Sequence, residues 1–145
     1  MQTFLPYADF EKSAAVLDNK RLGKQRVETL QIVKAITDPS YGWQNHPAVK
    51  MWRGHGLMLL DYQFAICQEW SGRGYKDTCF EKTADVIFNG GYDYCADDGT
   101  APLWLGDESI HLSHRSNLLR KDSAHYGPLF ERGLFDDLPY IWPVL

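Results

Sequence analysis

Three polar residues near the start of the chain have the spacing of one helical face and the chemistry of a possible site. Arg21, Gln25 and Glu28 stand at positions i, i+4 and i+7, so a helix places them in one row; we call them the early stripe. Glu28 also follows Lys24 by four residues. A carboxylate in this setting can act as a general acid or base, or stabilise a developing cation. The alternative is a surface ion pair that contributes about 0–1 kcal/mol to stability.

A second polar group lies near the other end of the chain. His111, His114 and Arg115 occupy positions i, i+3 and i+4, where an amphipathic helix usually carries Leu or Val; we call them the late stripe. Two histidines one turn apart can bind a metal, but a third ligand at suitable spacing is absent, so we expect no metal. An anion-binding face is the interpretation we favour, with Arg115 on a phosphate. The alternative is that backbone carbonyls satisfy these side chains.

Two further residues are candidates because of where they stand. Arg26 falls on the apolar side of its helix, beside Leu22 and Leu30, so it requires a carboxylate or several carbonyls as partners. His46 immediately precedes Pro47 at an expected helix start, which is a natural anion site. The alternative for His46 is a helix cap.

Apolar periodicity and capping residues predict the elements that position these groups. We expect a short helix after Asp9, and helices over about 20–36, 47–70 and 83–88. Asp18 or Asn19 is the expected cap of the helix over 20–36, and Asp107 caps a further helix that runs to about residue 120. Gly54 and Gly56 lie inside the third of these and indicate a kink or a close backbone approach. Residues 89–103 are rich in Gly and Asp and indicate a loop, with room for one short strand. The prediction is an all-α, compact single domain over residues 1–145, with about four to five helices and long irregular loops.

Composition limits the function classes. The chain has 145 residues and a net charge of −4, which argues against indiscriminate binding to polyanions. However, residues 20–34 are mainly basic and residues 77–108 mainly acidic, so one face can still be positive. Three cysteines without a CxxC pair and the lack of an 18-residue apolar run favour a cytoplasmic protein and no membrane association. The 14% aromatic content fits a small core or a base-stacking surface.

Several longer motifs resemble a known family. They are Met1-Gln-Thr-Phe-Leu-Pro-Tyr, Leu17-Asp-Asn-Lys-Arg-Leu-Gly-Lys-Gln-Arg-Val-Glu28 and His111-Leu-Ser-His-Arg-Ser-Asn-Leu-Leu-Arg-Lys-Asp122. Together they resemble small bacterial and phage proteins classed with the pyrimidine-dimer DNA glycosylase (endonuclease V) family. This resemblance implies a compact helical DNA-repair enzyme that cuts the glycosidic bond of a damaged base and then nicks the strand as an AP lyase. Glu28 matches the catalytic glutamate of that family.

The resemblance also implies a mechanism. An unprotonated amine attacks the sugar C1′ and forms a Schiff base, while Arg21, Lys24 and Arg26 hold phosphates, and neither metal nor cofactor takes part. The family's amine is exposed when Met is removed before a small residue. Here Gln2 follows Met1 and should block that removal. The nucleophile is then the α-amine of Met1 or the side chain of Lys24, unless the lyase chemistry is lost.

The expected function is therefore a DNA glycosylase/AP lyase that acts on damaged or modified pyrimidines, most simply as a monomer. The expected catalytic residues are Glu28 and either Met1 or Lys24. The expected substrate-binding residues are Arg21, Gln25, Arg26, His46, His111, His114 and Arg115. Two alternatives remain: an enzyme for a nucleotide or small phosphorylated ligand, and a non-catalytic nucleic-acid or protein-binding module. The enzymatic interpretation requires the early and late stripes to face one solvent-lined cavity.

Overall fold

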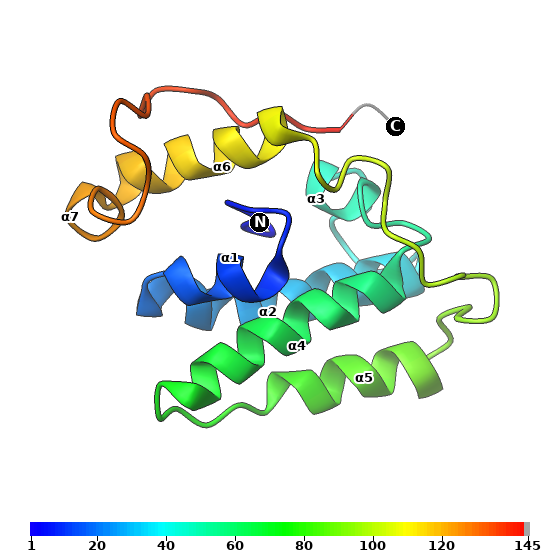
Figure 1. The fold of residues 1–145 in the computed structure, drawn as a ribbon. Coiled ribbons are helices and arrows are strands. Elements are labelled where there is room, and N and C mark those ends of the chain that lie inside the picture. The colour runs from blue at the N-terminus through cyan, green and yellow to red at the C-terminus, as the bar shows by residue number, and fades with distance from the viewer. Residues whose placement is uncertain (144–145) are drawn as a thin grey trace.

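The computed structural model describes residues 1–143, and within them it contains helices and no strands (Figure 1). The helices are α1 (Phe10–Val16), α2 (Asn19–Thr37), α3 (Pro47–Lys50), α4 (Gly56–Gly72), α5 (Cys79–Asn89), α6 (Glu108–Lys121) and α7 (Ser123–Tyr126). The all-α prediction is confirmed. The five longer helices match the predicted number, and α3 and α7 are single turns of four residues each.

Aspartates begin three of the helices, as the sequence predicts. The carboxylate of Asp9 accepts from the backbone N–H of Lys12, that of Asp18 from Arg21, and that of Asp107 from Ser109. Each bond satisfies one of the N–H groups that a helix start leaves without an intrahelical partner. The two polar stripes are thereby carried by well-defined helices, α2 and α6.

The expected single helix over residues 47–70 is wrong, because the chain breaks between α3 and α4. Gly54 has a φ of 78°, which lies outside the helical region and ends the first turn. The predicted close backbone approach is confirmed at Gly56, where a Cβ atom would lie 2.6 Å from the Tyr92 ring. The Tyr92 hydroxyl and the Asp97 carboxylate then accept from the N–H groups of Gly56 and Leu57, at 2.8 and 2.9 Å.

The helix expected at 83–88 is longer than predicted, since α5 begins at Cys79 and ends at Asn89. Its start is held by Asp77, whose carboxylate accepts from the N–H groups of Cys79 and Phe80. The loop that follows contains no strand in the part of the chain that is described.

The core forms where α2 packs against α4 and α5, and where α1 packs against α4. Its largest fully buried side chains include Trp52, Tyr62, Leu22, Ile32 and Ile66. Figure 1 shows α6 on the other side of the N-terminal residues from α2, with the C-terminal residues running alongside α6. The chain start is therefore enclosed between an early helix and a late one.

Two features looked for in the structure are not found within residues 1–143. No helix there combines the length and apolar character needed to cross a bilayer. No group of three or more His, Cys, Asp or Glu side chains in that range is arranged to hold a metal ion.

Candidate active site

The early stripe borders a pocket of about 300 Å³ at the N-terminus of the chain. Residues from α2, from the chain start and from the C-terminal part of the molecule surround it. The lining residues are Met1, Gln2, Phe4, Lys20, Arg21, Lys24, Glu28, Lys121 and Tyr140. Of the predicted site residues, Met1, Arg21, Lys24 and Glu28 are thus brought together.

Glu28 is the carboxylate of the pocket, and only 9% of the residue is exposed. Its Oε2 atom accepts from the backbone N–H of Gln2 at 3.2 Å and from Nε2 of Gln25 at 3.1 Å. Its Oε1 atom lies 3.6 Å from Nζ of Lys24. Two donors therefore orient one carboxylate oxygen, while the other faces a lysine side chain that is 70% exposed.

Positive charge is concentrated around this carboxylate. Arg21 pairs with Asp18 at 3.2 Å, but Lys20, Lys24 and Lys121 add three more cations to the lining. Burial, and then repulsion from Arg21 and neighbouring cations, lowers the pKa of Lys121. A phosphate bound among these cations would relieve the repulsion that acts on Lys121.

His46 lies close to this site without lining the pocket. Its Nδ1 atom accepts from the N–H of Ala48 at 3.0 Å, so it is the cap of α3. Burial lowers the pKa of its imidazole, the positive α-amine of Met1 lowers it further, and Glu28 opposes the shift. The charges of Met1 and Glu28 thus both act on the His46 imidazole. Its Nδ1 atom is not available to a ligand, because it accepts the hydrogen bond that caps α3.

Gln25, at 0% exposure, fixes the chain start to α2. Its Nε2 atom donates to the carbonyl oxygen of Gln2 at 2.9 Å, and its Oε1 atom accepts from the N–H of Phe4 at 2.9 Å. The hydroxyl of Tyr62 lies 2.7 Å from the same Oε1 and 2.8 Å from the carbonyl oxygen of Phe4. We call residues 2–6 the N-terminal segment; Gln25 holds it much as a neighbouring strand would.

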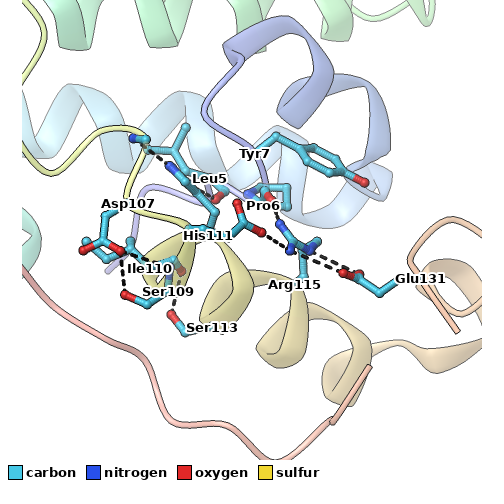
Figure 2. Close-up of polar contacts among 12 residues, drawn as sticks. Leu5, Pro6, Tyr7, Asp107, Ser109, Ile110, His111, Ser113, Arg115 and Glu131 are labelled. Carbon is cyan, nitrogen blue, oxygen red and sulfur yellow. Dashed lines mark hydrogen bonds and ion pairs between the residues drawn. The ribbon is translucent and has the colours of Figure 1, made fainter. Parts of the chain in front are cut away.

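The late stripe holds the other side of the N-terminal segment, and Figure 2 shows the contacts that His111 and Arg115 make with it. The N–H of Leu5 donates to Nδ1 of His114 at 2.9 Å. The N–H of Gly106 donates to Nε2 of His111 at 3.0 Å, so the hydrogen of that ring sits on Nδ1, which lies 2.8 Å from the carbonyl oxygen of Leu5. Both rings are 1% exposed, and burial lowers the pKa of His114 to about 3.

Arg115 completes this contact one residue further along. Its guanidinium donates to the carbonyl oxygen of Pro6 at 2.7 Å and forms ion pairs with Glu108 and Glu131 (Figure 2). The side chain is 7% exposed. All of its charge is thus directed at protein groups.

The structure therefore does not bring the late stripe to the pocket. His111, His114 and Arg115 are close to the early stripe in space, but the N-terminal segment lies between them and they are absent from the lining. Within residues 1–143 the two stripes therefore do not share this pocket, contrary to the expectation, and the enzymatic interpretation depends on the early stripe and the chain start alone. What α6 contributes to the pocket is Lys121, one turn beyond Leu118 on the same side as His114.

Arg26 also lies outside the pocket lining. The predicted carboxylate partner is confirmed: Asp77 lies 2.7 Å from Nη1. The guanidinium is also 4.6 Å from the centre of the Trp70 ring. Arg26 thereby joins α2 to the start of α5.

Sequence patterns did not point to Gln2, Phe4, Lys20, Lys121 or Tyr140 as lining residues. Gln2 and Phe4 lie in an irregular segment whose partners are distant in sequence. The position of Lys121 beside the pocket could have been predicted, because it follows His114 and Leu118 at helical spacing. No periodic pattern could have predicted the position of Tyr140, since residues 127–143 form no helix.

Comparison with known proteins identifies the family. A family model described as pyrimidine dimer DNA glycosylase matches residues 1–83, which is more than half of the chain and includes the whole early stripe. The search of curated proteins found no match, and the search of solved structures found none either. The match, together with a buried glutamate beside the chain start, shows that this chain belongs to the pyrimidine dimer DNA glycosylase family.

Proposed function

We propose that the protein is a DNA glycosylase/AP lyase that acts on damaged or modified pyrimidines in DNA. The observation that supports this most is the position of Glu28. Its carboxylate is buried, accepts a hydrogen bond from the Gln2 amide, lies 3.6 Å from Nζ of Lys24, and lines a cation-rich pocket together with Met1.

The α-amine of Met1 is the better candidate nucleophile. Only an unprotonated amine attacks, and α-amines in general have pKa values about 2.5 units below those of lysine side chains. Near neutral pH, the unprotonated fraction of an α-amine is therefore roughly two orders of magnitude larger. Lys24 already forms an ion pair with Glu28 at 3.6 Å.

In the proposed reaction, Met1 supplies the attacking amine and Glu28 transfers a proton. The lone pair of the Met1 nitrogen forms a bond to C1′, and the bond from C1′ to the base breaks, with its electrons leaving on the base, which takes up a proton. Glu28 then carries a proton from the nitrogen to O4′ as the sugar ring opens to an iminium. Removal of a C2′ proton expels the 3′ phosphate by β-elimination, and water hydrolyses the remaining imine.

The remaining side chains have binding and positioning roles in this proposal. Lys20, Arg21, Lys24 and Lys121 line the pocket from two helices and are suited to phosphates on both sides of the reacting nucleotide. The late stripe keeps the N-terminal segment fixed, so the amine is in place before the substrate arrives. Arg26 and His46 act through the fold, by joining α2 to α5 and by capping α3.

Borohydride trapping on a duplex with one abasic site tests the proposal. The native protein should give a covalent adduct, and Lys24→Ala should keep it, while protein with an acetylated α-amine should lose it. Adduct from the acetylated protein but none from Lys24→Ala would reassign the nucleophile to Lys24. No adduct from native protein, together with DNA binding of steep salt dependence, would favour the non-catalytic module. A thermal shift with free nucleotides and none with DNA would favour the small-ligand enzyme.

A further inference from the structure

Four aromatic side chains form a continuous row that leads away from the pocket. Tyr140, which lines the pocket, is 5.8 Å from Trp142 between ring centres. Trp142 is 5.9 Å from His46, and His46 is 5.7 Å from Trp43, both edge to face. The C-terminal residues and the loop before α3 thus build one surface, which we call the aromatic row.

Trp43 is the exposed end of this row, and its backbone is strained. It is 55% exposed and is the one non-glycine residue in the described part of the chain with a positive φ, at 69°. A bulky side chain in the left-handed region costs of order 1–3 kcal/mol and persists only where surrounding contacts enforce it. Such strain tends to be retained at functional sites.

Gln44 provides the contacts that enforce this conformation. Its Nε2 atom lies within 3.0 Å of the carbonyl oxygens of Ala35, Asp38 and Tyr41. Nη2 of Arg53 donates to both the backbone and the side-chain oxygen of Gln44, each at 2.8 Å. The loop is therefore fastened to α2 and to the turn after α3, and it presents the Trp43 ring on a rigid support.

The row is also next to the proposed reaction centre. His46, in its middle, is close enough to the α-amine and to Glu28 for both charges to act on its imidazole. The row begins at Tyr140 in the pocket lining and continues through Trp142 and His46 to Trp43, so DNA bound at the pocket can extend along it. Removing a base from the duplex leaves a neighbour without its stacking or pairing partner.

We propose that the aromatic row, with Trp43 at its exposed end, is a stacking site for an unpaired nucleobase of the DNA bound at the pocket. The inference rests on the proposed function for the identity of the ligand. Flat rings held rigidly suit this role, because stacking on an aromatic side chain contributes about 1–3 kcal/mol per base and tolerates any base. An edge-to-face array also leaves an outer ring face open for a base.

Fluorescence anisotropy with three duplexes of one sequence tests the row: fully paired, with one abasic site, and with one bulged base. The abasic duplex carries a tetrahydrofuran analogue, which has no C1′ hydroxyl and cannot form a Schiff base, so binding is measured separately from chemistry. Trp43→Ala should weaken binding to the bulged and abasic duplexes about 5- to 100-fold and change binding to the paired duplex less than 2-fold.

A second variant and a control make this test specific. Trp43→Asn should weaken binding to the same two duplexes, and it keeps the loop conformation because Asn tolerates a left-handed φ. Phe135→Ala removes another exposed aromatic, at 70% exposure, outside the row and is the matched control.

The outcomes separate this inference from the proposed function. Unchanged binding of bulged DNA by both Trp43 variants would overturn the stacking site, whatever the adduct assay shows. An equal loss on all three duplexes would overturn it as well, because the effect would then be general. Selective loss on unpaired DNA supports the site even if no borohydride adduct forms, in which case the enzymatic proposal alone fails.

Discussion

The polar faces of α2 and α6 contact the same five-residue N-terminal segment from opposite sides, yet they are chemically unlike. On α2, Glu28 uses one carboxylate oxygen to bind the segment and directs the other toward a solvent-connected pocket. On α6, each nitrogen that His111 offers is occupied by a backbone partner. Polar residues on one face of a helix thus form a reactive group in α2 and a support in α6. The difference is that Glu28 keeps one oxygen facing the pocket, whereas both nitrogens of His111 are bonded to the backbone.

Replacing Glu28 tests the reactive side of this comparison and should have the largest effect. Glu28→Gln keeps an acceptor for the Gln2 amide but removes the charge and the proton-transfer capacity, so adduct formation should slow about 10²- to 10⁴-fold. Rates of trapping and urea denaturation should be measured together. A rate within threefold of native would remove Glu28 from the chemistry.

Replacing His111 tests the supporting side. His111→Leu leaves the Leu5 carbonyl and the Gly106 N–H without their partner, and each buried unsatisfied group costs about 1–3 kcal/mol. The free energy of unfolding, measured in urea, should therefore fall by about 2–6 kcal/mol. His55→Leu is the control, because that imidazole makes one long, exposed contact with Thr100. Equal losses in the two variants would contradict the supporting role.

The buried ring of His114 predicts a pH dependence of stability. Its folded pKa of about 3 lies below the ordinary value near 6.5, so between these limits the unfolded chain binds a proton that the folded chain excludes. Stability should thus fall as the pH drops from 6.5 toward 3, by up to about 1.4 kcal/mol per pH unit. Gln at position 114 cannot titrate and offers an oxygen to the Leu5 N–H, so His114→Gln should show a shallower dependence in urea titrations at pH 4, 5 and 6. Parallel curves for the two proteins would argue against a buried neutral ring.

Removing one pocket cation should have the smallest effect. Lys121→Gln should reduce the slope of log binding constant against log salt by about one and weaken binding similarly on every DNA sequence. Lys82→Gln is the matched control, because Lys82 is exposed on α5, away from the pocket lining. If both variants changed the slope equally, the pocket would not be the place where DNA phosphates bind.

Local signals in the sequence predicted the helices well, and long-range contacts account for the errors. The Asp9, Asp18 and Asp107 caps are local, and the corresponding helices begin as predicted. Gly54 and Gly56 gave a local signal of the break before α4. The partners that hold the start of α4, Tyr92 and Asp97, lie 36 and 40 residues further along, and no local pattern reveals them.

The candidate site follows the same rule. Helical spacing identified Arg21, Lys24 and Glu28 as neighbours, and the structure places them around one pocket. The same spacing grouped His111, His114 and Arg115, but it could not reveal that their partner is the backbone of residues 5 and 6. A polar residue at a core-facing position needs a partner, and periodicity alone cannot tell a substrate from a distant stretch of backbone.

Leu5 bonds to His111 and to His114, which follow it in the sequence by 106 and 109 positions. During synthesis, the peptide groups of Leu5 therefore cannot form these hydrogen bonds until α6 has been made. Contacts of such long range form late and slow the search for the native state. A translation product that stops after α5 would contain Glu28 but leave the Leu5 peptide groups without these partners, so the ability to react with DNA should arise only once α6 has been made.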